Sequence, residues 1–244
     1  MCIRDRDTIF NSDPEIIITD KSNFHSIASI PKLRSKTIYV LAEKEWFEKN
    51  NSNEKEILSV DNLLGHSSEF ELPNQHYGET TSILWTSGTT GAPKGVMQSN
   101  NTWIRSALSS IELGEIKGGD IAFNCMPLYN SAAWVTSIYP ALLTGTTCAI
   151  DTKFSASKFW DRTRYYSATH IFTLGAMHMF LWNLPRRSND GENPVRSAQM
   201  IPMADEIIPL FKKRFNINAL HEGFGVSEIM HLMRRHDNLS LIHI

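Results

Sequence analysis

The sequence predicts an α/β fold in which mostly parallel β-sheets are flanked by helices. Short apolar, β-rich runs alternate along the chain with longer segments of helical periodicity. Because the runs are apolar at nearly every position, we expect both faces of their strands to be buried, as in a parallel sheet covered by helices. The six runs span residues 15–19, 37–42, 82–86, 121–125, 146–150 and 169–173.

Two of the segments between these runs begin with residues that commonly cap helices. Asn100 or Asn101 can cap a helix that extends to about Leu113, and Ser155 can cap another that extends through Tyr166. Strands that alternate with helices in this way are typical of α/β domains.

Composition excludes several classes of protein. The 244 residues, 41% of them hydrophobic, can bury one large core or two small ones. The net charge of -2, without a basic stripe, argues against nucleic acid as a partner. The longest apolar stretch, 132–143, is interrupted by polar residues and a proline, so no transmembrane segment is expected. Cys2, Cys125 and Cys148 are too widely spaced for a disulfide framework or a zinc site, and we expect a cytoplasmic protein.

The segment TSGTTGAPKG, residues 86–95, directly follows an apolar run. Its glycines allow backbone amides to approach a ligand closely, and its hydroxyls and Lys94 suit a polyphosphate. The segment is not a Walker A loop, because Pro93 stands in place of the second glycine and Gly95 follows the lysine. From composition alone, a flexible surface turn is the alternative.

The order of residues 87–96 resembles the signature loop of the adenylate-forming superfamily, which includes acyl-CoA synthetases, nonribosomal adenylation domains and luciferases. Two further motifs of that superfamily follow in its usual order. A Pro-Leu-aromatic turn occurs at 127–130, and an aromatic-Gly-x-hydroxyl-Glu motif occurs at 224–228. The resemblance covers residues 13–237 and implies a partial N-terminal domain of an adenylate-forming enzyme.

The resemblance implies that the loop and the 224–228 motif bind one ATP molecule. The loop hydroxyls and Lys94 would hold the β- and γ-phosphates, Phe224 would stack on adenine, and Ser227 would bind the α-phosphate. Glu228 would be the magnesium ligand, and Lys94 and Glu228 are the expected catalytic residues. The expected nucleotide-binding residues are Thr86, Ser87, Gly88, Thr89, Thr90, Gly91, Lys94, Phe224, Gly225 and Ser227. We expect the loop to join two strands at a cleft that residues 224–228 also reach.

Tyr129 and Asn130 are the expected acid-binding residues. Acyl-CoA synthetases usually carry His where this chain has Asn130, and nonribosomal adenylation domains carry an Asp that pairs with the substrate ammonium. Because Asn130 is neutral, an α-amino acid substrate is disfavoured. The stretch 156–160 is similar to carnitine-type CoA ligases.

The resemblance therefore implies ATP-dependent activation of a carboxylic acid as an acyl-adenylate and transfer of the acyl group to coenzyme A. The partners would be a small carboxylic acid, ATP with Mg²⁺, and coenzyme A. Two alternatives stay open. One is an enzyme that adenylates an amino or aryl acid, and the other is a non-catalytic nucleotide-binding remnant.

We expect residues 7–238 to form part of the adenylation domain and residues 1–6 and 239–244 to be non-native extensions. From the resemblance, we also expect the ribose-binding Asp motif and the C-terminal domain with its catalytic lysine to be missing from this sequence, and the chain alone to be an inactive fragment. His170 and His178 flank a predicted strand and are expected to be core histidines with satisfied hydrogen bonds.

Overall fold

The computed structural model describes residues 8–9, 11–33, 36–50, 57–59, 71, 73–87, 93–230 and 233–234. The chain divides into two compact units, the first made of residues 1–75 and 85–94 and the second of residues 76–84 and 95–244. The expected domain boundaries at residues 7 and 238 fall outside the described residues and stay predictions. Among the described residues, no helix is long and apolar enough to cross a membrane.

The first unit contains a three-stranded parallel sheet in the order β1-β2-β3. Asp20 caps the first helix of this unit, because its side chain accepts a hydrogen bond from the backbone N–H of Asn23 at 2.9 Å. Ile17 is buried against that helix, whereas Ile16 and Ile18 on the opposite face are largely exposed. The expectation that both faces are buried is therefore wrong for β1. The elements are β1 (Ile16–Asp20), α2 (Lys21–Ala28), η1 (Pro31–Leu33), β2 (Thr37–Leu41), α3 (Lys44–Asn50) and β3 (Ile57–Ser59).

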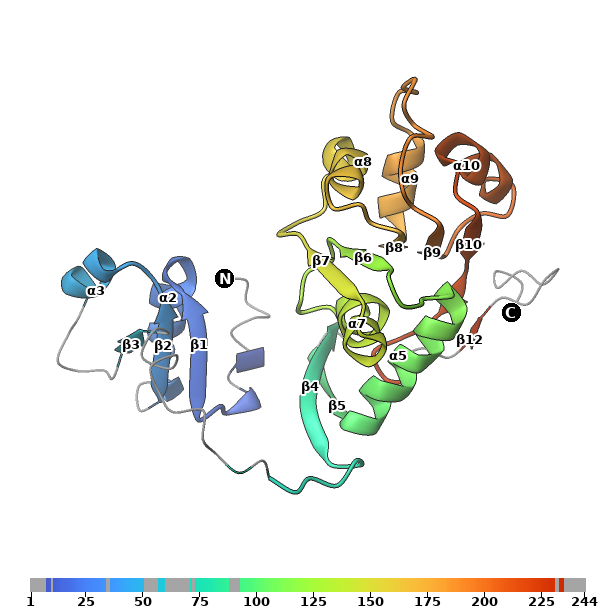
Figure 1. The fold of residues 1–244 in the computed structure, drawn as a ribbon. Coiled ribbons are helices and arrows are strands. Elements are labelled where there is room, and N and C mark those ends of the chain that lie inside the picture. Colours follow the sequence, from blue (N-terminus) through green and yellow to red (C-terminus); the bar gives the residue numbers. More distant parts are fainter. Residues whose placement is uncertain are drawn as a thin grey trace. The chain divides into compact units, whose positions relative to one another are not determined.

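The second unit is built on a five-stranded parallel sheet in the order β10-β9-β8-β6-β7. The predicted α/β class with mainly parallel sheets flanked by helices is confirmed (Figure 1). Its strands are β6 (Ile121–Asn124), β7 (Thr147–Ile150), β8 (His170–Leu174), β9 (Ser197–Ile201) and β10 (Ala219–His221). The connecting segments include α5 (Asn100–Gly114), α6 (Ser131–Ala133), the π-helical turn η2 (Trp134–Ile138), α7 (Tyr139–Thr144), α8 (Ala156–Tyr165), α9 (Ala176–Trp182) and α10 (Ile208–Phe215).

The order of the strands contains a reversal between β6 and β8. The chain passes from β6 to β7 on one side, then places β8 on the other side of β6 and continues outward through β9 and β10. Such a reversal leaves a crevice at the carboxyl ends of the two strands, where open α/β sheets bind their ligands. The topology thus singles out the segments that follow β6 and β8.

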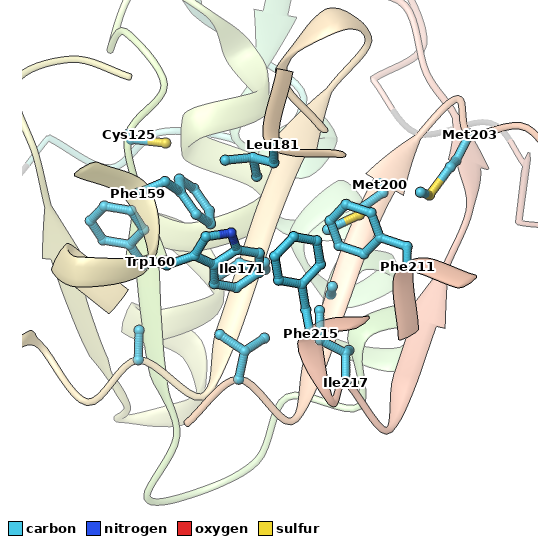
Figure 2. Packing of buried hydrophobic residues seen from close by; sticks show 14 residues of the cluster. Cys125, Phe159, Trp160, Ile171, Leu181, Met200, Met203, Phe211, Phe215 and Ile217 are labelled. Atoms are coloured by element: carbon cyan, nitrogen blue, oxygen red, sulfur yellow. The ribbon is translucent and has the colours of Figure 1, made fainter. Parts of the chain in front are cut away.

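Helices α8, α9 and α10 cover one face of this sheet and α5 lies on the other (Figure 1). The core on the first face is apolar and rich in aromatic rings, and its labelled members are shown in Figure 2. Trp160 of α8 stacks on Phe215 of α10 with ring centroids 4.4 Å apart. The face that carries α5 is different, because Ser197 Oγ donates to Gly114 O at 2.7 Å from within the buried interface.

An ion pair lies at the amino-terminal ends of the strands of this sheet. Asp120 precedes β6 and pairs with Arg196, which precedes β9, and Thr169 Oγ1 donates to the Asp120 carboxylate at 2.8 Å. Burial alone would raise the pKa of the Asp120 carboxyl, but hydrogen bonds from the Lys117 N–H, Arg196 and Thr169 hold it below its usual value. This network joins the starts of three strands.

Several local predictions need correction. The run 82–86 lies in β4 (Thr80–Ser87), which pairs with β5 (Pro93–Ser99) in a separate two-stranded sheet. Only residues 88–92 separate these two strands in the sequence. Five residues are too few for the crossover connection that two parallel neighbouring strands need, so the prediction that run 82–86 belongs to a parallel sheet is wrong. The N-cap of α5 is Ser99, whose Oγ accepts from Thr102 N at 3.3 Å, rather than Asn100 or Asn101. Ser155 occupies the cap position of α8 but makes no side-chain capping bond.

Candidate functional site

A cavity of about 240 Å³ lies at the strand reversal, within the second unit. It is bounded by residues that follow β6, by the last residues of β8 and β9, by α5, and by the 225–230 segment. Three of the residues predicted from the sequence, Asn130, Gly225 and Ser227, line this one cavity. The full lining is Ser110, Asn130, Ser131, Ala132, Val135, Thr136, Phe172, Leu174, Gln199, Ile201, Gly225, Val226, Ser227 and Met230.

Asn130 has a structural role at the wall of this cavity. Its side-chain Oδ1 accepts from Ala132 N at 2.9 Å and so caps the short helix α6. Trp134 Nε1 donates to Leu128 O at 2.7 Å and closes the turn that precedes the cap. Tyr129 belongs to the same turn but is 87% exposed and is not among the cavity-lining residues. The structure therefore brings Asn130 to the cavity and leaves Tyr129 outside it.

The 224–228 motif lies against β5. Gln98, which is buried in β5, donates a hydrogen bond from its side-chain amide to the backbone carbonyl of Ser227. Phe224 lies in β11 (Gly223–Phe224), which pairs antiparallel with β12 (Met233–Arg234), and its ring is partly exposed. Glu228 is exposed as well. An exposed ring and an exposed carboxylate are both accessible to a ligand.

The loop itself is only partly described. As predicted, it joins two strands, because β4 ends at Ser87 and β5 begins at Pro93. Gly88, Thr89, Thr90 and Gly91 lie outside the described residues, as does the side chain of Ser87. Thr86 and Lys94 belong to the first unit, where Thr86 is partly buried and Lys94 is exposed. The predicted meeting of the loop with Glu228 therefore stays a prediction.

The two histidines beside β8 differ in their hydrogen bonds. His178 is buried as expected, and its ring nitrogens contact Thr173 Oγ1 at 3.2 Å and Pro202 O at 2.7 Å. His170 is completely buried, but neither of its ring nitrogens has a hydrogen-bond partner among the described residues. The expectation of satisfied bonds is thus confirmed for His178 and wrong for His170. Burial lowers the pKa of His170 to about 3, so its imidazole is neutral.

Most of the cavity-lining residues carry no motif that the sequence alone reveals. Leu174 and Ile201 end their strands at its rim, and Phe172 and Gln199 lie two residues earlier on the same faces of β8 and β9. The run 169–173 was expected to be a strand, and the rule that ligands bind at the carboxyl ends of parallel strands would have pointed to Leu174. The sequence of β9, SAQMI, contains two polar residues and gave no strand signal.

Comparison with known proteins agrees with this architecture. The profile of a family described as AMP-binding enzyme matches residues 6–241. Long-chain fatty acid transport protein 2 of Rattus norvegicus is 35% identical over 146 residues, which is 59% of this chain and 23% of that protein. The medium/long-chain-fatty-acid CoA ligase FadD6 of Mycobacterium tuberculosis is 31% identical over 151 residues, which is 62% of this chain and 25% of that protein.

Among solved structures, the anthranilate CoA ligase AuaEII in complex with anthranoyl-AMP superimposes with a TM-score of 0.80. The superposition covers 96% of this chain and 45% of that one, at 15% sequence identity, and therefore concerns the fold. The matched part of the chain spans about a quarter of the length of each of these two curated relatives.

Proposed function

Since the chain belongs to the AMP-binding enzyme family, we propose that it takes part in the ATP-dependent activation of a carboxylic acid as an acyl-adenylate, followed by transfer of the acyl group to coenzyme A. The observation that carries the proposal is the cavity at the strand reversal, where Asn130 meets Gly225 and Ser227 although it lies far from both in the sequence. The CoA ligase activity of FadD6 supports the choice of coenzyme A as acceptor.

In the proposed first step, a carboxylate oxygen attacks the α-phosphorus of ATP, and the bond from that phosphorus to the bridging oxygen breaks as pyrophosphate leaves. The protein would act mainly by electrostatics, because the charge that moves onto the leaving group needs nearby donors. We assign this role to Lys94, to the hydroxyls of Ser87, Thr89 and Thr90, and to the backbone amides of the loop. Phe224 would stack on adenine, and Ser227 would bind the α-phosphate.

Glu228 fits the role of magnesium ligand. Its carboxylate is exposed, and Mg²⁺ prefers one or two carboxylates together with phosphate oxygens. A bound Mg²⁺ would neutralise charge on the phosphates. Glu228 would hold that ion beside the phosphate tail while Ser227, the preceding residue, stays fixed by Gln98.

The acid would enter the cavity with its carboxylate at the rim and its acyl group directed inward. Ala132, Val135 and Ile201 supply an apolar lining. Asn130 carries no charge to pair with an ammonium group, which favours a simple carboxylic acid over an amino acid. A cytoplasmic location is part of the proposal and is consistent with the free thiols of Cys125 and Cys148.

The test is binding of acyl-sulfamoyladenosines, stable mimics of acyl-adenylates, to the purified chain by isothermal titration calorimetry. Hexanoyl, benzoyl and alanyl mimics represent aliphatic, aryl and amino acids. We expect the hexanoyl mimic to bind more tightly than the alanyl mimic and than sulfamoyladenosine without an acyl group. Tighter binding of the alanyl or benzoyl mimic would favour an amino- or aryl-acid enzyme. Absence of binding by all three would refute the proposal.

A further inference from the structure

We infer that Ser110 and Gln199 form a polar recognition site at the inner end of the cavity, which selects an acyl group carrying a hydroxyl, carbonyl or amide at its far end. This inference rests on the proposed function and refines its substrate class. It departs from a plain fatty acyl chain, whose far end is a methyl group.

The position of the two residues follows from the strands. Leu174 and Ile201 end β8 and β9 at the rim, and Phe172 and Gln199 lie two residues inward, roughly 7 Å along the strands. Exposure falls in the same direction, from 38% at Leu174 to 4% at Phe172 and 1% at Gln199. Ser110, on α5, is also 1% exposed. Ser110 and Gln199 therefore lie at the inner end of the cavity.

Two hydrogen bonds hold the pair in place. Ser110 Oγ donates to Gln199 Oε1 at 3.1 Å, and Gln199 Nε2 donates to the backbone carbonyl of Ser110 at 2.8 Å. These bonds leave the second N–H of the Gln199 amide and the acceptor lone pairs of the Ser110 hydroxyl for a ligand. A methyl group placed there would cover these polar atoms without bonding them, whereas a hydroxyl or amide could bond both.

His170 gives independent support for a polar inner end. It follows Phe172 inward on the same face of β8, and its fully buried ring nitrogens have no partner among the described residues. The ring lies beside Gln199, because a Cβ on Gly114 would stand 2.5 Å from Gln199 Nε2 and 2.7 Å from His170 Cε1. Ser110 and Gln199 thus line the inner end of the cavity, and the unpaired imidazole of His170 lies next to Gln199 behind that lining.

The experiment compares two acyl-sulfamoyladenosines of equal length, 6-hydroxyhexanoyl and heptanoyl, which differ by a hydroxyl in place of a methyl. Their dissociation constants are measured by calorimetry on the full 244-residue chain. We expect the hydroxyl compound to bind about tenfold more tightly, since a buried site built for a hydrogen bond discriminates against an analogue that lacks it. Ser110→Ala and Gln199→Met should reduce the ratio to about twofold or less.

Ser106→Ala is the matched control, because Ser106 is a buried serine on the same helix that does not line the cavity. It should keep the tenfold ratio. A ratio near one in the unmodified chain would overturn the inference, and so would a ratio unchanged in the variants. If Gln199→Met does not fold, Ser110→Ala decides. Binding of both compounds with equal affinity would overturn the inference and leave the proposed function intact. If no acyl mimic binds, the inference and the proposed function are both overturned.

Discussion

Replacing His170 by leucine should remove part of the protein's sensitivity to acid without destabilising it at neutral pH. In the folded chain the imidazole is buried without hydrogen-bond partners among the described residues, and burial lowers its pKa to about 3. An apolar side chain of similar size loses no hydrogen bond there and avoids the cost of burying two unpaired polar atoms. At pH 7 we therefore expect the free energy of unfolding of His170→Leu to equal or exceed that of the unmodified chain.

The size of the acid effect follows from proton linkage. An unfolded histidine has a pKa near 6.5, so below that pH the unfolded chain binds a proton that the folded chain excludes. Stability therefore falls as the pH falls from about 6.5 towards 3, by about 1.4 kcal/mol per pH unit at most. Between pH 7 and pH 5, His170 alone should lower the free energy of unfolding by about 2 kcal/mol.

The assay is urea unfolding of both proteins at pH 7, 6 and 5, followed by tryptophan fluorescence and far-ultraviolet circular dichroism. His178 and His221, whose pKa values burial also lowers, act in the same direction in both proteins and cancel in the difference. The unmodified chain should lose about 2 kcal/mol more than His170→Leu between pH 7 and pH 5. Equal losses in the two proteins would show that His170 is solvated or paired in solution and would refute the reasoning.

Three further predictions concern the nucleotide loop, the ion pair at the amino-terminal ends of the strands and the contact of Gly114 with Gln199 and His170. Lys94→Ala should weaken binding of a fluorescent ATP analogue about tenfold without changing the melting temperature. The control Lys117→Ala, just before β6, should leave the affinity unchanged. Equal affinities of Lys94→Ala and the unmodified chain would contradict the role of Lys94. Asp120→Asn should lower the free energy of unfolding by about 2 kcal/mol at pH 7, because it weakens charge-assisted hydrogen bonds to a buried carboxylate; since the folded pKa is lowered, this difference should shrink as the pH falls below 3.8. Gly114→Ala should lower the free energy of unfolding by about 1–3 kcal/mol in urea, because the new Cβ would stand under 3 Å from both Gln199 and His170; an unchanged free energy would mean that these two side chains can move aside.

The chain's local patterns contain enough information for its fold class. Five of the six apolar runs are strands of parallel sheets, since Val, Ile and Phe in short runs pack well on a pleated surface. The sixth, 82–86, is a strand as well, but its apolar character could not reveal that its partner is β5. Strand β9 was missed because Ser197 and Gln199 face a polar interface with α5, which no local pattern distinguishes from a loop.

The sequence by itself determined the family, because the order of residues in the loop at 86–95 and in the motif at 224–228 is recognisable without a structure. It also indicated Asn130, Gly225 and Ser227, which line the cavity. Only the tertiary structure decided that Ser110 and Gln199 meet at the end of that cavity and that His170 is buried without partners. The contact between Ser110 and Gln199 joins residues 89 positions apart in the sequence. It depends on the order of the strands and on the packing of α5 against the sheet, which sequence periodicity does not encode.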